Sequence, residues 1–191
     1  MKIVAIVGSP RPTGNTSLLV DQALQGAAAH GCETEKIMLC QYKVNPCLGH
    51  DRCSTFPACK QQDDVPWILE KFSNADGIIL ATPVYYYNMT AQMKTFIDRN
   101  YFLYTHDIPL RARTAGYIVI AGGSAIDITL RALRRCFRIQ GNNPEERIIT
   151  LTAYASRLGD IKSQPAVLEE AHKLGERMAE ILITQQKPTT A

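Results

Sequence analysis

Four stretches of the chain carry almost only apolar residues, without the alternation of a half-buried strand. They are residues 2–8, 76–82, 114–122 and 147–154. Such continuous runs are typical of strands in a parallel sheet that is buried on both faces by helices. A fifth stretch, residues 32–39, mixes polar and apolar positions and is expected to form a strand at the edge of the sheet. The pattern therefore predicts five strands.

Apolar residues at helical spacing fill the intervals between these strands. Helices are predicted over residues 16–30, 64–75, 90–104, 125–140 and 165–183. Because strand and helix alternate five times, we expect an α/β fold with right-handed crossovers between parallel strands. The arrangement that fits is a flavodoxin-like three-layer sandwich with a five-stranded parallel sheet in the order 2-1-3-4-5. It would form one domain over residues 1–184, with an insertion at residues 41–63 and a polar tail at residues 185–191.

Composition and charge narrow the class of partner. The 191 residues include 46% hydrophobic residues, enough for one core, and 21 basic against 18 acidic side chains, spread without long runs. This balance argues against nucleic-acid and membrane partners. The apolar run at the N-terminus is too short for a signal peptide or a membrane span. We expect a cytoplasmic protein whose six cysteines stay mostly reduced.

The loop after the first predicted strand, GSPRPTGNTSLL (residues 8–19), is rich in groups that bind phosphate. Hydroxyls, one guanidinium and the backbone amides of a helix N-terminus suit a dianionic phosphate, and glycine lets the backbone come close. An ordinary turn, with Asn15 or Thr13 capping the helix, is the alternative. The loop lacks the glycine patterns of dinucleotide and triphosphate sites, an acidic pair and a cysteine nucleophile. The phosphate of a mononucleotide is the remaining ligand.

A second loop follows the third predicted strand, in TPVYYYNMTAQMKTFIDR (residues 82–99), and presents three consecutive tyrosines. Ligands of such sheets bind beyond the carboxyl ends of the strands, near the switch between the first and third strands, where both loops are expected. Flat rings with hydroxyl groups suit a planar heteroaromatic ligand, although any single tyrosine fits equally well as a core residue.

Together, the two motifs resemble the NAD(P)H-dependent FMN reductase superfamily, whose patterns GSPRxxGNT and PVYxxxxxAxxKxFIDR they match. The resemblance covers residue 1 to about residue 160 and implies that FMN binds at a subunit interface, in a homodimer or homotetramer. The residues that it implies for FMN are Ser9, Arg11, Gly14, Asn15, Thr16 and Ser17 at the phosphate, Pro83, Val84, Tyr85, Tyr86, Tyr87 and Asn88 along the ribityl chain and ring, and Gly122 and Gly123 in a loop over the ring. The glycine pair is equally consistent with a plain strand-to-helix turn.

More narrowly, the chain resembles an iron-sulfur flavoprotein, a branch with a compact cysteine motif after the second strand. That motif is C-x2-C-x2-C with a later fourth cysteine and then an aspartate pair, here Asp63 and Asp64. In NPCLGHDRCSTFPACKQQDD (residues 45–64) the second position is a histidine. The candidate metal ligands are therefore Cys47, His50, Cys53 and Cys59.

This ligand set leaves an iron-sulfur cluster, zinc and no metal open. Four thiolates usually hold a cubane cluster, but imidazole replaces thiolate at some iron-sulfur centres. Three cysteines with one histidine also suit tetrahedral zinc. Even without a metal, an irregular segment of this length in a compact domain is typically functional, here as an electron relay or as a wall that faces the substrate.

The resemblance implies an FMN-dependent oxidoreductase that takes hydride from NAD(P)H. Its acceptor would be a small molecule, namely a quinone, a flavin or a metal ion, or an electron-transfer protein of the ferredoxin type. No side chain is assigned a catalytic role, because the chemistry belongs to the cofactor. Two alternatives are a flavodoxin-like carrier or iron-sulfur flavoprotein without direct reaction with NAD(P)H, and a non-redox mononucleotide-binding module. Asp98 and Arg99, which end the second motif, are expected to pair across a dimer or to lie in solvent.

Overall fold

A computed structural model describes residues 1–140 and 144–185, so that residues 186–191 of the predicted tail lie outside the described chain. Five parallel strands form the sheet in the order β2-β1-β3-β5-β6, and a short sixth strand, β4, pairs antiparallel with β3. The predicted α/β flavodoxin-like order is therefore confirmed. The strands are β1 (Lys2–Val7), β2 (Glu33–Met38), β3 (Gly77–Tyr85), β4 (Asn88–Met89), β5 (Thr114–Ala121) and β6 (Ile148–Tyr154).

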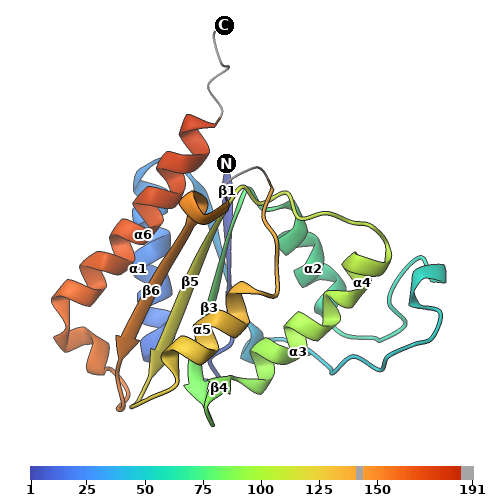
Figure 1. Ribbon diagram of the computed structural model, residues 1–191, viewed down its shortest axis with the longest axis horizontal. Helices are drawn as coiled ribbons and strands as arrows, with labels where there is room; N and C mark the ends of the chain where they lie inside the picture. The colour runs from blue at the N-terminus through green and yellow to red at the C-terminus, as the bar shows by residue number, and fades with distance from the viewer. Residues whose placement is uncertain (141–143, 186–191) are drawn as a thin grey trace, which may run out of the picture.

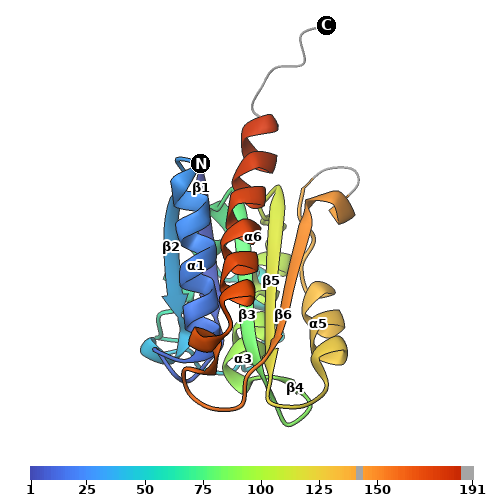
Figure 2. The same cartoon turned by 90° about the vertical axis from the view of Figure 1, so that its left-hand side faces the viewer.

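Helices cover the sheet in two layers. Helices α1 and α6 lie on one face, and the other helices lie on the opposite face (Figures 1 and 2). Among the described residues, no helix is long and apolar enough to cross a membrane. The helices are α1 (Asn15–Ala29), α2 (Val65–Asn74), α3 (Ala91–Arg99), α4 (Tyr101–Thr105), α5 (Ile126–Arg134) and α6 (Pro165–Thr184).

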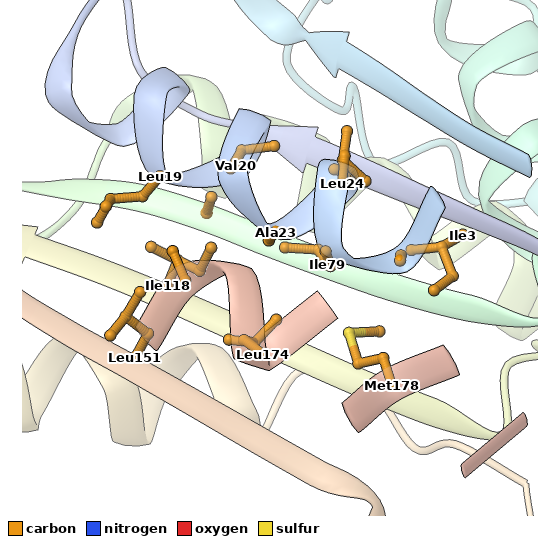
Figure 3. Packing of buried hydrophobic residues seen from close by; sticks show 14 of the residues in the cluster. Ile3, Leu19, Val20, Ala23, Leu24, Ile79, Ile118, Leu151, Leu174 and Met178 are labelled. Atoms are coloured by element: carbon orange, nitrogen blue, oxygen red, sulfur yellow. The ribbon is translucent and has the colours of Figure 1, made fainter. Parts of the chain in front are cut away.

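Alternate residues of each central strand supply two separate cores. Ile3 of β1 and Ile79 of β3 pack under α1 and α6 together with Leu174 and Met178 (Figure 3). The next residue along β1, Val4, belongs to the second core under α2, α3 and α5. Successive side chains of a strand point to opposite faces of the sheet, so each continuous apolar run fills both cores.

Helices α1 and α6 cross at very close range because glycines stand at the crossing. A Cβ atom on Gly175 would lie 1.7 Å from the carbonyl oxygen of Ala23, and one on Gly26 would lie 2.1 Å from that of His172. No side chain fits at such distances. This face of the molecule is therefore fixed by packing of small residues and aliphatic side chains.

Three predicted elements differ from the observed ones. Strand β6 was expected to be buried on both faces, but Thr150, Thr152 and Tyr154 are exposed, because β6 is an edge strand and only its other face packs against α6. The helix predicted over residues 90–104 ends at Arg99, and α4 follows it as a separate helix after Asn100. The helix predicted over residues 125–140 ends at Arg134.

Candidate functional site

A cavity of about 260 Å³ lies at the carboxyl ends of the parallel strands, where the loops after β1, β3, β5 and β6 meet. This edge is the lower one in Figure 1. Ligands of open α/β sheets bind at this position. The lining residues are Ser9, Arg11, Gly14, Asn15, Thr16, Pro83, Val84, Tyr85, Ile120, Gly122, Ala155 and Ser156.

The loop after β1 is built to receive an anion. The first hydrogen bond of α1 runs from the amide of Leu18 to the carbonyl of Gly14, so the amides of residues 15–17 precede the helical ladder. Within the described residues, no side chain caps this helix, and the predicted alternative of a cap by Asn15 or Thr13 is wrong. Exposed amides at a helix N-terminus, with the positive end of the helix dipole, attract phosphate.

Local hydrogen bonds shape this loop. The Ser9 hydroxyl accepts a hydrogen bond from the Arg11 amide at 3.1 Å, and the Gly14 amide donates to the Arg11 carbonyl at 3.0 Å. A Cβ atom on Gly14 would lie 3.0 Å from the Cβ of Arg11 and 3.1 Å from its carbonyl oxygen, so the turn has little room for a side chain. The exposed Arg11 guanidinium lines the cavity beside the helix terminus.

Gly8 joins this loop to the start of α3. A Cβ atom there would lie 2.7 Å from the Cβ of Met93 and 2.9 Å from the hydroxyl of Thr90. Instead, the Thr90 hydroxyl donates to the Gly8 carbonyl at 2.6 Å and accepts from the Met93 amide at 3.2 Å, which makes Thr90 the N-cap of α3. The phosphate-type loop and the tyrosine segment are thus held against each other.

The three tyrosines lie at the tip of the β3–β4 hairpin. Tyr86 and Tyr87 form its two-residue turn, with φ of 46° and 66°. Two-residue hairpins need positive φ at such positions and usually place Asn or Gly there, so two tyrosines strain the backbone. Tyr86 is 97% exposed and Tyr87 66% exposed, while Tyr85 lines the cavity. None of the three is a core residue, and strained exposed rings beside a cavity are typical of a ligand site.

Several predicted FMN residues lie outside the cavity lining. The Ser17 side chain is buried and accepts a hydrogen bond from Lys36 Nζ at 3.0 Å, although its backbone amide belongs to the helix terminus. The Asn88 side chain accepts from the Met89 amide at 2.8 Å. Gly123 follows Gly122 in an exposed loop.

The loop after β6 contributes to the site and was missed by sequence reasoning. Its Ser156 hydroxyl donates to the Gly122 carbonyl at 2.9 Å. The Asn15 side chain donates to the Arg157 carbonyl at 2.8 Å and accepts from the Gly159 amide at 2.9 Å. Asn15 was predicted to contact phosphate, but its amide group ties the loop after β6 to α1. The sequence carries no motif at residues 155–160 that could have revealed this contact.

The cysteine loop, defined here as residues 42–64, lies beside α4, to the right in Figure 1. Cys47 is exposed, Cys53 and Cys59 are half-buried, and His50 packs edge-on to Phe56. In the described ranges, no three His, Cys, Asp or Glu side chains gather closely enough to hold a metal ion. The predicted ligands therefore do not form a metal site in this arrangement.

A buried ion pair anchors this loop to α3. The Arg99 guanidinium forms a fork on Asp63, through Nη1 to Oδ2 and through Nη2 to Oδ1 at 3.1 Å. The Arg99 side chain is 2% exposed and the Asp63 side chain 0% exposed. Burial alone would raise the pKa of Asp63, but the Arg99 fork and the amides of Asn45 and Val65 outweigh it and lower the pKa. Arg99 was expected to pair across a dimer or to lie in solvent, but its side chain is buried and its partner, Asp63, lies in the same chain.

Four clefts of the described residues are larger than this cavity, and the two largest lie away from it. One, of about 530 Å³, is lined mainly by apolar residues of α2, α4 and the cysteine loop. The other, of about 770 Å³, lies between α3, α4 and residues 135–138. Neither contains the uncapped helix terminus or a glycine turn, so the smaller cavity at the strand ends has the chemistry of a cofactor site.

The sequence of the chain matches that of the NADPH-dependent FMN reductases over residues 1–147. The chain belongs to this family. An iron-sulfur flavoprotein of Methanocaldococcus jannaschii is 37% identical over 191 residues, which cover 95% of this chain and 97% of the relative. An iron-sulfur flavoprotein of Archaeoglobus fulgidus is 36% identical over 181 residues, covering 94% and 80%.

A solved structure of similar fold is an NAD(P)H:quinone oxidoreductase from Methanothermobacter marburgensis. Its TM-score is 0.73 at 15% identity, with 93% of this chain and 96% of that chain covered. At that identity the likeness concerns the fold alone. Membership of the FMN reductase family, in its iron-sulfur flavoprotein branch, makes the protein an FMN-dependent oxidoreductase. The uncapped terminus of α1, the glycine turn and Arg11 fit the phosphate of FMN.

Proposed function

We propose that this FMN-dependent oxidoreductase takes hydride from NAD(P)H and passes electrons to an acceptor. The acceptor would be a quinone, a free flavin or a metal ion, or an electron-transfer protein of the ferredoxin type. The observation that carries the proposal is the cavity at the strand ends, which joins an uncapped helix terminus to a strained, exposed tyrosine hairpin. One end of this cavity suits a phosphate and the other suits a flat ring.

The phosphate end has a defined set of donors. The amides of residues 15–17, the Ser9 hydroxyl and the Arg11 guanidinium would bind the phosphate oxygens of FMN, with Thr16 and Gly14 beside them. Hydrogen bonds from charged or helix-terminal donors to phosphate are about twice as strong as those between neutral groups. Asn15 acts on this end through its hydrogen bonds to the loop after β6.

The ring end is formed by the hairpin and two neighbouring loops. Pro83, Val84 and Tyr85 would line the ribityl chain and ring. Flavin, when bound, supplies the hydride and electron transfer chemistry, so the protein needs to bind, orient and shield it. The remaining predicted ring contacts are the exposed residues Tyr86, Tyr87 and Asn88 of the hairpin and Gly122 and Gly123 of the loop after β5, positions that a second subunit would complete.

The proposed function also includes the domain, the assembly and the candidate metal ligands. Residues 1–184 would act as one FMN-binding domain that assembles as a homodimer or homotetramer in the cytoplasm. Cys47, His50, Cys53 and Cys59 stay a predicted ligand set, and metal analysis of anaerobically purified protein tests it. If each chain contained one zinc ion or the iron of one cluster, the cysteine loop would have to rearrange from the arrangement described above.

The experiment that tests the function is anaerobic stopped-flow mixing of the FMN-loaded protein with NADPH or NADH, followed by the visible flavin absorbance. We expect one of the two nucleotides to bleach the flavin, and dithionite serves as the control for full reducibility. Bleaching by dithionite alone would overturn the NAD(P)H reaction. Failure to take up FMN at all would leave the mononucleotide-binding module as the better description.

The relatives' names favour a second candidate, an electron carrier of the iron-sulfur flavoprotein type without direct reaction with NAD(P)H. Such a carrier would be reduced by a protein donor and would ignore both nucleotides. The same stopped-flow measurement, repeated with a reduced ferredoxin-type protein, separates the two functions.

A further inference from the structure

Arg99 is a charged side chain that is buried against the cysteine loop, and it binds that loop at three points. Beyond its fork on Asp63, its Nη1 donates to the carbonyl of Asn45 at 2.9 Å and its Nη2 donates to the sulfur of Cys59 at 3.4 Å. Asn45 lies near the start of the loop, and Cys59 and Asp63 lie near its end. A single guanidinium therefore gathers parts of an irregular segment that has little regular structure of its own.

Asp63 extends this contact to the backbone. Its Oδ2 accepts from the amide of Asn45 at 3.1 Å, and its Oδ1 accepts from the amide of Val65 at 3.3 Å. Asp64 closes the base of the loop by accepting from the amide of Lys43 at 2.7 Å. The aspartate pair thus joins the two ends of the loop, and Arg99 fixes the joined ends to α3.

Helix α3 connects this anchor to the cavity at the strand ends. At its N-terminus, the Thr90 hydroxyl donates to the carbonyl of Gly8, next to Ser9 of the phosphate-type loop. Arg99 is the last residue of the same helix. One short, rigid helix therefore holds the phosphate-type loop at one end and the cysteine loop at the other.

We propose that Arg99 is a positioning residue, which sets the place of the cysteine loop, and of Cys59 in particular, relative to the flavin site. The ion pair lies within one chain and its side chains are buried. The loop is therefore held in one position against α3 and does not open and close over the site. This inference depends on the placement of the loop and not on whether the loop binds a metal.

A second contact holds the far side of the loop and defines what Arg99 contributes alone. His106 donates from Nε2 to the carbonyl of Phe56 at 2.8 Å, and its ring stacks on that of Phe102 with the ring centroids 3.9 Å apart. Loss of Arg99 should therefore free residues 44–49 and 57–63 more than the turn around Phe56.

The test uses three variants of the full chain. Arg99→Lys keeps the charge but cannot fork, and Asp63→Leu with Arg99→Met replaces the buried pair by apolar residues that restore packing. Asp98→Asn is the control, because it breaks only the exposed Lys94–Asp98 pair on the same helix. Hydrogen exchange of the loop amides and the alkylation rate of Cys59 relative to exposed Cys47 are measured by mass spectrometry.

We expect exchange in residues 44–49 and 57–63 and alkylation of Cys59 to rise at least tenfold in both Arg99 variants, while the control stays within twofold of the natural chain. In the double variant, exchange of the loop should rise while exchange of α1 and α6 stays unchanged. If the pair only stabilised the whole fold, its loss would change exchange in α1 and α6 as well. Unchanged loop exchange, or equal acceleration in α1 and α6, would overturn the proposal. The measurements need no flavin, so failure to bind FMN would overturn the proposed function and leave this inference standing.

Discussion

The loops that follow β1 and β2 leave neighbouring strands at the same edge of the sheet, yet they are stabilised in different ways. The loop after β1 is short and local, with the Ser9 hydroxyl and the Gly14 amide bonding to Arg11 two and three residues away. The cysteine loop is long, and its strongest contacts come from Arg99, 36 residues beyond Asp63. The first loop presents unpaired backbone amides to a ligand, whereas the buried carboxylate of the cysteine loop, Asp63, is already paired with Arg99 within the protein.

The two loops should therefore respond differently to the cofactor and to mutation. A loop whose helix terminus has no side-chain cap gains its last hydrogen bonds from a ligand, so its stability should depend on FMN. A loop that is tied by a buried ion pair should gain little from FMN directly, because the charges of Asp63 and Arg99 already have partners without a ligand. Changes at Arg99 should therefore act on folding, and changes at Arg11 should act on binding.

The largest effect is expected from Arg99→Met, which leaves the Asp63 carboxylate buried without its partner. Such a change typically costs about 3–5 kcal/mol of the free energy of unfolding. Urea unfolding followed by circular dichroism measures it. The Asp63→Leu, Arg99→Met double variant should regain most of the loss, and an unchanged midpoint in Arg99→Met would show that the pair does not stabilise the fold.

A change confined to binding is expected from Arg11→Ala. Loss of one charged hydrogen bond to phosphate should weaken FMN about 10- to 100-fold, since such bonds contribute roughly 1.5–3 kcal/mol. Riboflavin, which lacks the phosphate, is the matched control and should bind both proteins equally. Because Arg11 is exposed, the unfolding midpoint should stay the same. Fluorescence titration with both flavins gives the two affinities, and equal weakening of both would contradict a phosphate role.

The ion pair also predicts how stability depends on pH. The pKa of Asp63 is lowered in the folded protein, so the pair contributes fully above the ordinary aspartate value of about 3.9. As the pH falls below that value and through the folded pKa, the contribution is lost. The difference in urea midpoint between the natural chain and Asp63→Asn should therefore be constant near neutral pH and shrink below about pH 4. A difference that does not change with acid would exclude an ionised Asp63.

The smallest effect, with opposite signs for folding and binding, is expected from Tyr86→Gly. Glycine accepts the positive φ of 46° without strain, so the thermal midpoint should rise by an amount that corresponds to about 1 kcal/mol. FMN affinity should fall modestly, because the exposed ring would no longer be available to the flavin. Tyr104→Ala, which removes an exposed ring in α4, serves as the control for loss of a surface tyrosine.

Local patterns made the sheet and the first loop predictable. Four apolar runs and one mixed edge stretch predicted the five parallel strands, their alternation with helices predicted the observed order, and GSPRPTGNT predicted the place of Ser9, Arg11 and Gly14 at the cavity. Long-range partners were not predictable. The Ser17 hydroxyl of α1 accepts a hydrogen bond from Lys36 of β2. The Asn15 side chain bonds to backbone groups of the loop after β6, which lie 142 to 146 positions further along the chain. No local sequence signal points to either contact. Similarly, the motif that ends in Arg99 gave no sign that Asp63 would be its partner in the same chain.

The most direct test of the contrast between the two loops is hydrogen exchange of the natural chain with and without saturating FMN. We predict that FMN slows exchange of the amides in residues 9–18 and 155–161 at least tenfold. Residues 44–63 should exchange at the same rate in both samples, because Arg99 already holds them. Strong protection of residues 44–63 by FMN, or none at residues 9–18, would contradict the account.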